Sequence, residues 1–258
     1  MKTKSLGFIG GGRITKIMLQ VIANNKTEYK AIVVYDTNPE VLTALKIQFP
    51  GITVADSNME PAQQDMVFIA LHPPAIMDAL ESIKSEIKSS SVLISLAPKI
   101  SIAKIASKLP NNKNIVRLIP NATSVINEGY NPVCFAEAMS EWKKQTMLSI
   151  FRRMGHTFEV AEPKLESYAI MSAMLPTYFW FQWKELIDLG CKIGLTEDES
   201  LNSVRDTMLA ALRTYFYSDL TPDQVIDLIP VKPIGEYETQ IRDIYNEKLL
   251  SLFEKIKP

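Results

Sequence analysis

The chain contains 258 residues, of which 47% are hydrophobic, and its formal net charge at pH 7 is −1. This length allows one large domain or two ordinary domains, each with a sizeable core. The charges are balanced and form no long block of one sign, which argues against nucleic acid or a membrane surface as the main partner and leaves small molecules as the expected class.

The start of the chain differs from a secretion signal. The apolar run in MKTKSLGFIGGGR is broken by glycines and followed by Arg13. The most aromatic stretch, residues 175–183, is much shorter than the roughly 20 residues that a membrane span needs. Cys134 and Cys191 lie far apart and outside any CxxC or histidine-paired motif, which favours buried free thiols. We therefore expect a cytoplasmic protein without a metal site.

Short β-rich runs alternate with amphipathic stretches from residue 5 to about residue 120. The runs occupy residues 5–10, 31–36, 65–73, 91–98 and 114–120. This alternation is typical of βαβ units with a parallel sheet. We predict an α/β domain over residues 1–161, completed by strands at 131–136 and 157–160 with a helix between them that begins near Met139.

After residue 161 the sequence is typical of helices only. Three amphipathic stretches follow, at residues 164–194, 197–220 and 236–257. Pro176 is expected to kink or divide the first stretch, and Thr196 is expected to cap the second. Gly190 and Gly194 are interpreted as helix-end or turn positions. We predict a second, helical domain over residues 162–258.

The first predicted strand ends in GGGRIT, residues 10–15. These residues supply the first two glycines of a G-x-G-x-x-G fingerprint, in which backbone amides and a helix N-terminus face a pyrophosphate. Thr15 takes the third position and is expected to weaken helix packing more than phosphate contact. A plain strand-to-helix turn is the alternative, but the flanking strand and helix favour a dinucleotide site. The predicted phosphate-binding residues are Gly10, Gly12, Arg13 and Ile14.

The second predicted strand ends in Asp36, 26 residues after Gly10. An acidic residue at that strand end typically hydrogen-bonds the adenosine ribose. A carboxylate there also repels a 2′-phosphate, so the sequence predicts an NAD(P) cofactor with NAD slightly favoured over NADP. The alternative role for Asp36 is to cap the helix that begins near Pro39, although Asn38 is the better cap.

Five motifs follow one another along the chain: FIGGGRITK, ALHPPAIMDAL, LISLAPKISIAKI, VRLIPNATSVINEGYNPV and ESYAIMSAMLPTY. In this order they resemble the pyrroline-5-carboxylate reductase family, over about residues 5–195. The resemblance implies a Rossmann-type dinucleotide-binding domain followed by an all-helical dimerisation domain that also contributes to the substrate site. It also implies a homodimer or higher homo-oligomer, and an NAD(P)H-dependent oxidoreductase that reduces a cyclic imine such as pyrroline-5-carboxylate to proline.

The resemblance assigns roles residue by residue. Gly10 and Gly12 match the phosphate-binding glycines. The segment that lines the cofactor is matched by Ala70, His72 and Pro73, with His72 where the family usually has lysine. The family's Arg-x-x-Pro-Asn core is matched by Arg117, Pro120 and Asn121. Its helical motif is matched by Ser172, Pro176 and Tyr178. We therefore predict Asn121, Ser172 and Tyr178 as catalytic residues, with Asn121 also contacting the cofactor.

The chain departs from the family at residues 227–238. There the family has a Ser-Pro-Gly-Gly-Thr-Thr loop that holds the substrate carboxylate, whereas this chain reads DLIPVKPIGEYE. Its prolines are incompatible with a nest of consecutive amides, and Lys232 is either a substitute charge or a solvated loop residue. The alternatives are therefore a reductase of a different imine, carbonyl or deazaflavin substrate, or a dinucleotide-binding protein without catalysis. Lys99, in the LAPKIS turn, is either within reach of a substrate or a solvated turn residue.

Overall fold

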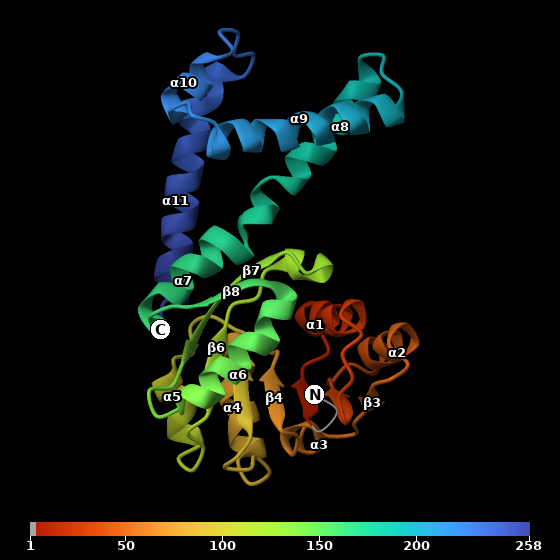
Figure 1. Ribbon diagram of the computed structural model, residues 1–258, viewed down its shortest axis with the longest axis vertical. Helices are drawn as coiled ribbons and strands as arrows, with labels where there is room; N and C mark the ends of the chain where they lie inside the picture. Colours follow the sequence, from red (N-terminus) through yellow and green to blue (C-terminus); the bar gives the residue numbers. More distant parts are fainter. Residues whose placement is uncertain (1–3) are drawn as a thin grey trace. The chain divides into compact units, whose positions relative to one another are not determined.

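The first part of the chain folds around one mixed sheet (Figure 1). In the computed structural model, which describes residues 4–258, eight strands follow the order β3-β2-β1-β4-β5-β6-β7-β8. Neighbouring strands are parallel, except that β6 and β7 are antiparallel. The strands are β1 (Ser5–Ile9), β2 (Ala31–Tyr35), β3 (Thr53–Val54), β4 (Met66–Ile69), β5 (Val92–Ser95), β6 (Ile115–Leu118), β7 (Gly129–Phe135) and β8 (Gly155–Glu159). The predicted α/β fold with a parallel sheet is confirmed for the strands up to β6.

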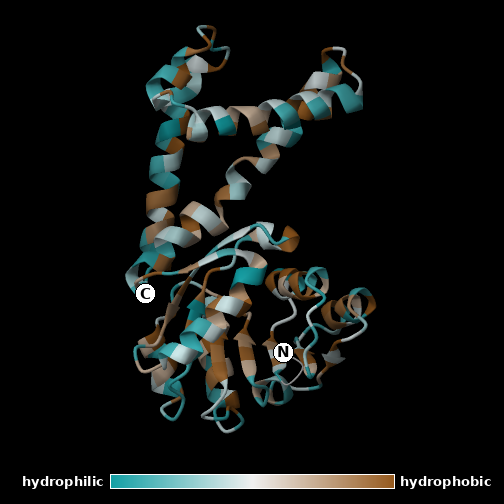
Figure 2. Ribbon diagram, in the orientation of Figure 1, coloured by the Kyte–Doolittle hydropathy of each residue, from teal (hydrophilic) through white to brown (hydrophobic). Residues whose placement is uncertain are grey.

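Helices cover both faces of this sheet. One face packs against α1 (Arg13–Asn24), α2 (Pro39–Gln48) and α6 (Glu141–Phe151). The other packs against α3 (Met59–Ala62), α4 (Pro73–Ile83) and α5 (Ile102–Lys108). Because successive strand residues point to opposite faces, Phe8 and Phe68 belong to the first core, and Ile9 and Ile69 to the second. Figure 2 shows these hydrophobic strands between helices that carry hydrophilic residues.

The sequence did not predict β3. This strand has two residues, Thr53 and Val54, and both are exposed at the edge of the sheet. It therefore has no apolar run, and its pairing depends on hydrogen bonds to β2. The cysteine prediction is confirmed for Cys134, which is buried, and is wrong for Cys191, which is exposed. Burial raises the pKa of the Cys134 thiol to about 12.

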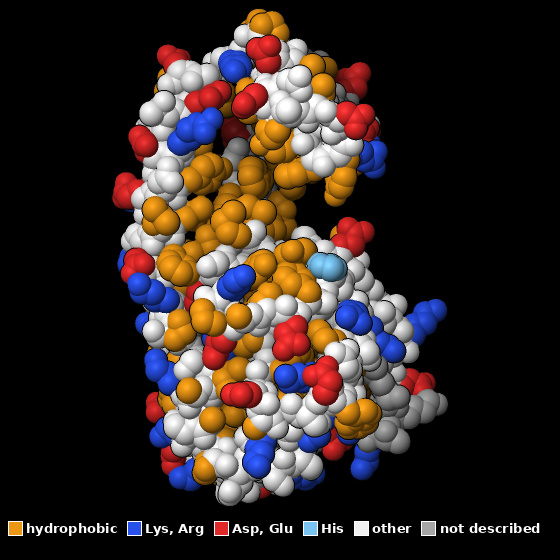
Figure 3. All heavy atoms as spheres, turned by 60° about the vertical axis from the view of Figure 1, so that its left-hand side comes forward, with side chains coloured by type: hydrophobic (Ala, Val, Ile, Leu, Met, Phe, Trp, Pro, Cys, Tyr) orange, Lys and Arg blue, Asp and Glu red, His pale blue; other side chains and the backbone are white. Residues whose placement is uncertain are grey.

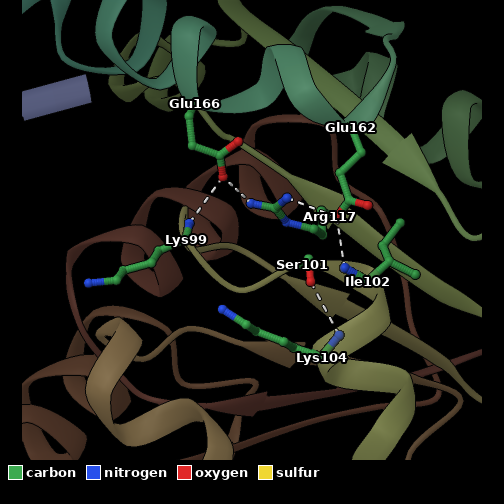
Figure 4. Close-up of polar contacts among 7 residues, drawn as sticks. All are labelled: Lys99, Ser101, Ile102, Lys104, Arg117, Glu162 and Glu166. Carbon is green, nitrogen blue, oxygen red and sulfur yellow. Dashed lines mark hydrogen bonds and ion pairs between the residues drawn. The ribbon is translucent and has the colours of Figure 1, made fainter. Parts of the chain in front are cut away.

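A buried ionic cluster joins β6 to the chain that follows the sheet (Figure 4). The Arg117 side chain is fully buried, and its guanidinium pairs with Glu162 at 2.9 Å and with Glu166, which is 1% exposed. The same carboxylates accept backbone N–H groups, from Ile102 at 2.7 Å and from Lys99 at 3.1 Å. The cluster therefore fixes the turn between β5 and α5 as well as the start of α7 (Leu165–Tyr168).

The first predicted helical stretch is broken at Pro176, as expected. After α7 the chain forms a π-helical turn at 169–173 and a 3₁₀ turn at 175–178 before α8 (Trp180–Lys192) begins. The remaining helices are α9 (Glu197–Tyr217), α10 (Pro222–Asp227) and α11 (Glu238–Ile256). Thr196 caps α9 in a capping box with Glu199, which confirms that prediction. None of the helices within residues 4–258 is both long enough and apolar enough to pass through a membrane.

Gly190 and Gly194, both predicted near a helix end, occupy different positions in the structure. Gly194 has φ +109° and follows α8, as expected of a helix end. Gly190 lies inside α8 instead, where a Cβ atom would stand 2.1 Å from the Ser200 hydroxyl of α9. That glycine allows α8 and α9 to approach closely, which a helix-end interpretation misses.

Packing divides the chain into two compact units. The first contains residues up to Met174 together with Phe253–Pro258, and the second contains Leu175–Leu252. The sheet ends before residue 162, where the helical composition begins, but residues 162–174 pack with the first unit because the glutamates of the ionic cluster lie there. The domain division into 1–161 and 162–258 stays a prediction.

We predict that Arg117→Met lowers the free energy of unfolding by about 3–5 kcal/mol, because Glu166 would remain buried without its cation. Adding Glu166→Leu is expected to restore much of the loss, since Arg117 Nε and Glu166 Oε2 have no partner among the described residues and the cluster is incompletely satisfied. Urea unfolding followed by circular dichroism measures both. Arg152→Met, at an exposed arginine, is the control and should cost within about 0.5 kcal/mol. A loss below about 1 kcal/mol for Arg117→Met would contradict the prediction.

Candidate functional site

The glycine turn at the end of β1 brings two strand ends into close contact. Gly10 has φ +103°, and a Cβ atom at this position would lie 2.4 Å from the carbonyl oxygen of Ala70. Its N–H donates to the Tyr35 carbonyl at 2.8 Å. The fold itself therefore requires glycine at position 10, because both the dihedral angle and the space exclude a side chain.

Gly12 has a different role. It is the N-cap of α1 with ordinary extended dihedrals, and a Cβ atom there would have no heavy atom of the described residues within 4 Å. No side chain from the described part of the chain caps α1, and the first helical residue is the exposed Arg13. A cation in the first turn is unfavourable beside the positive end of a helix dipole. Open space, uncapped amides and Arg13 together fit an anionic ligand.

Thr15 does not loosen the turn. Its side chain is fully buried, and its hydroxyl donates to the Gly10 carbonyl at 2.6 Å. The expectation that Thr15 weakens helix packing is therefore not supported, since the hydroxyl joins α1 to the glycine turn. Ile14 is partly buried and packs against the core beneath α1.

Asp36 connects the end of β2 to the glycine turn. Its Oδ2 accepts the Gly11 N–H at 2.7 Å, and its Oδ1 accepts the Asn38 N–H at 2.8 Å. Asn38 caps α2 by accepting from Glu40 at 2.9 Å, as predicted. The half-buried carboxylate also lines a hollow of about 540 Å³, to which Asp56 contributes a second carboxylate. An acid is thus held beside the glycine turn at the position where a ribose is expected.

The turn after β4 lies next to the glycine turn. The Ala70 N–H donates to the Ile9 carbonyl at 2.8 Å, and Ile69 pairs with Ile9 in the sheet. His72 is the exposed N-cap of α4, and Pro73 is its first residue. The strand order reverses between β1 and β4, and such a reversal places a ligand crevice at the carboxyl ends of the strands. The residues predicted to bind the phosphates and the ribose therefore lie at the same carboxyl edge of the sheet as residues 70–73.

Asn121 and Ser172 also lie together, but their polar groups bond within the protein. Asn121 is buried, its Oδ1 accepts the Thr123 N–H at 2.9 Å, and its Nδ2 donates to the Ser172 carbonyl at 2.7 Å. The Ser172 hydroxyl donates to the Tyr168 carbonyl at 2.7 Å. These bonds hold the end of β6 against the π-helical turn. The catalytic roles of both residues stay predictions.

Tyr178 belongs to the second unit. Its ring lies 6.2 Å from that of Tyr245, measured between centroids. Burial raises the pKa of the Tyr178 hydroxyl, and the neighbouring Tyr245 adds to the rise. The raised pKa makes the hydroxyl a weaker acid, so its polar role is that of a neutral hydrogen-bonding group.

Sequence reasoning missed the residues of the ionic cluster that face Arg117. Glu162 and Glu166 stand at the start of a helical stretch, where acidic residues are common. The only signal was Arg117 itself, because an arginine inside an apolar strand needs carboxylate partners once it is buried. The left-handed backbone of Lys99, with φ +78°, had no signal in the sequence.

The comparisons with known proteins agree with this geometry. A family model described as NADP oxidoreductase coenzyme F420-dependent matches residues 5–99. The chain is 26% identical to pyrroline-5-carboxylate reductase of Escherichia coli (strain K12) over 228 residues, which cover 88% of this chain and 84% of that protein. It is also 26% identical to pyrroline-5-carboxylate reductase 1 of Bacillus subtilis (strain 168) over 229 residues, with coverages of 88% and 77%.

A solved structure extends the similarity to the whole fold. Plasmodium falciparum pyrroline carboxylate reductase with NADP bound matches with a TM-score of 0.79 at 25% identity, covering 99% of this chain and 96% of that one. In sequence and in fold, the chain is therefore similar over most of its length to pyrroline-5-carboxylate reductases, which confirms the resemblance that its motifs indicated.

Proposed function

We propose that this protein is an NAD(P)H-dependent oxidoreductase that reduces the C=N bond of a cyclic imine such as pyrroline-5-carboxylate, giving proline. The observation that carries the proposal is the turn at Gly12, where packing does not require glycine and the helix amides are left open. Similarity to the Escherichia coli pyrroline-5-carboxylate reductase over 88% of the chain supports the substrate class.

We assign the cofactor to the carboxyl edge of β1, β2 and β4. Its phosphates would lie beside the turn at Gly10 and Gly12 and contact the amides of Arg13 and Ile14 and the Arg13 side chain, and its adenosine ribose would bind Asp36. The segment from Ala70 to Pro73, including His72, would line the rest of the cofactor, with Asn121 at the nicotinamide end. These assignments rest on the shared edge and on the open amides of α1.

Reduction of an imine depends more on the positioning of the cofactor and the substrate than on strong acid-base catalysis. A reduced nicotinamide supplies a hydride to the imine carbon, and a proton on the imine nitrogen makes that carbon electrophilic. The protein must hold two flat rings in contact and exclude water. Asn121 and Ser172 would shape the reaction site in the first unit, and Tyr178, in the second unit, is kept as a proposed catalytic residue on the strength of the family resemblance.

The cofactor preference follows from charge. Asp36, with Asp56 beside the same hollow, would repel a 2′-phosphate, so we propose that NADH is favoured over NADPH. The match to an NADP-bound reductase concerns that protein and supports only the wider NAD(P) class for this one.

The second unit is proposed to form a homodimer. Hydrophobic side chains gather along its helices (Figure 3), and α9 exposes Leu209, Leu212, Tyr215 and Phe216, whose exposed fractions range from 41% to 66%. An apolar groove between α8 and α9, which Trp183 also lines, continues this surface. Contiguous apolar surface of this kind is unusual on a monomer, and a second copy is the occupant that closed symmetry favours.

We predict that the purified protein oxidises NADH when pyrroline-5-carboxylate is present, followed as the loss of absorbance of the reduced nicotinamide. Gly12→Val should lower dinucleotide affinity about tenfold or more, because a side chain would occupy the space assigned to phosphate. Its melting temperature should stay near that of the parent, since the fold leaves that space open.

Gly51→Val is the matched control for this experiment. A Cβ atom at Gly51 would likewise have no heavy atom of the described residues within 4 Å, but this glycine lies in an exposed turn before β3. A folded protein that binds the dinucleotide without turning over any imine, carbonyl or deazaflavin would instead support a binding protein without catalysis.

We predict that Asp36→Asn lowers the preference for NADH over NADPH, measured as the ratio of kcat/KM values, by about tenfold. Asparagine removes the charge and keeps one acceptor for the backbone amides. Asp78→Asn, at an exposed carboxylate on α4, removes the same charge elsewhere and should leave the ratio unchanged. An unchanged ratio in Asp36→Asn would remove the assignment of Asp36 to the ribose.

We predict a dimer or larger oligomer by light scattering after size exclusion. Leu212→Glu should shift it towards monomer, because a carboxylate would be buried in the apolar contact. Trp142→Glu, at a residue that is 72% exposed on α6, is the control and should keep the parent mass. A monomeric parent protein would refute the dimer.

A further inference from the structure

We infer that Lys99 is the residue that binds the carboxylate of a substrate such as pyrroline-5-carboxylate. The inference rests on the proposed imine reduction and deepens it. The first observation is the backbone of Lys99, which has φ +78°. Residues other than glycine rarely adopt this left-handed conformation. Such positions persist only where surrounding structure fixes them, and they concentrate at functional sites.

The buried ionic cluster fixes this conformation. The Lys99 N–H donates to Glu166 Oε1 at 3.1 Å, the same oxygen that pairs with Arg117. Both Glu166 and Arg117 are almost completely buried. In Figure 4 the Lys99 side chain leaves the turn on the side away from the guanidinium. The cluster therefore holds the backbone from inside and leaves the ammonium group outside.

The Lys99 ammonium has no carboxylate partner among the residues that the structure describes. The side chain is exposed, and none of the carboxylates in residues 4–258 lies within 4.0 Å of its Nζ. Lys108, at the other end of α5, in contrast pairs with Glu81 at 3.0 Å. A charge at a rigid position that pairs with no carboxylate of residues 4–258 is available to a ligand.

The position fits a substrate better than the cofactor phosphates. The turn that contains Lys99 follows β5, whose end lies beside β4, since the Leu96 N–H donates to the Ile69 carbonyl at 3.2 Å. The glycine turn follows β1, two strands away, whereas Asn121 follows β6, the next strand on the other side. Lys99 therefore lies towards the end of the edge assigned to the nicotinamide and the imine.

The chemistry also calls for a cation there. Residues 227–238 contain prolines instead of the Gly-Gly-Thr-Thr amides that the family resemblance led us to expect around a carboxylate. A lysine ammonium supplies a charge-assisted hydrogen bond to a substrate carboxylate without a nest of amides. Lys99 is favoured over Lys232 for this role because Lys99 belongs to the same unit as the edge assigned to the cofactor.

The test compares two imines in the holoenzyme. Lys99→Gly should raise the KM for pyrroline-5-carboxylate about tenfold or more, because one charged hydrogen bond is lost. The KM for 1-pyrroline, which has the same ring and no carboxylate, should stay within about twofold, as should the Kd for NADH. The melting temperature of Lys99→Gly should rise, since glycine relieves the left-handed backbone. A lysine with a purely structural role would lose stability instead.

Two further variants complete the design. Lys99→Arg keeps the charge and should retain most of the affinity for pyrroline-5-carboxylate. Lys113→Ala removes an exposed lysine before β6, at the opposite edge of the sheet, and should leave both KM values unchanged.

Each other outcome is decisive. An unchanged KM for pyrroline-5-carboxylate in Lys99→Gly would overturn the inference and leave the proposed function intact. A weaker Kd for NADH with an unchanged imine KM would assign Lys99 to the cofactor phosphates and also overturn it. A parent enzyme that reduces 1-pyrroline but not pyrroline-5-carboxylate would overturn carboxylate recognition alone. A parent enzyme inactive on both imines would overturn the proposed function and the inference with it.

Discussion

The interaction on which this fold depends most is the burial of Arg117 with two carboxylates. A guanidinium inside a sheet is costly unless it is paired, so the chain after β8 must return across the end of β6 to supply Glu162 and Glu166. That return in turn sets the turn between β5 and α5 and places the π-helical turn where Asn121 reaches the Ser172 carbonyl. One buried charge thus organises three loops at the same sheet edge.

The sequence predicted those features that depend on local pattern. The alternation of apolar runs predicted the parallel strands, and the caps at Asn38 and Thr196 lie where short polar side chains precede a helix. The features that it missed depend on contacts between distant residues. Neither the left-handed Lys99 nor the glycine in mid-helix at position 190 is determined by its neighbours in the chain, because each is fixed by a partner more than nine residues away.

The candidate site could be predicted only in part for the same reason. The glycine turn and Asp36 are adjacent to strands that the pattern identifies, so their convergence follows from the topology. Thr15 was misjudged because its hydroxyl bonds the Gly10 carbonyl, which only the three-dimensional turn reveals. Asn121 and Ser172 were predicted from resemblance, and the structure adds that their polar groups hold loops together, a function that no motif expresses.

The bonds of Asp36 have a consequence for how this turn can change. Its carboxylate accepts a hydrogen bond from the Gly11 N–H, so this amide cannot donate to a phosphate. A bound phosphate can therefore use only the amides that follow Gly12. Recognition of a ribose hydroxyl and the shape of the phosphate-facing loop are therefore coupled through one side chain. A redesign of nucleotide preference that removes this carboxylate without an acceptor in its place would release Gly11 and Asn38 together and disorganise the loop it aims to retune. Selectivity and loop geometry must be redesigned jointly.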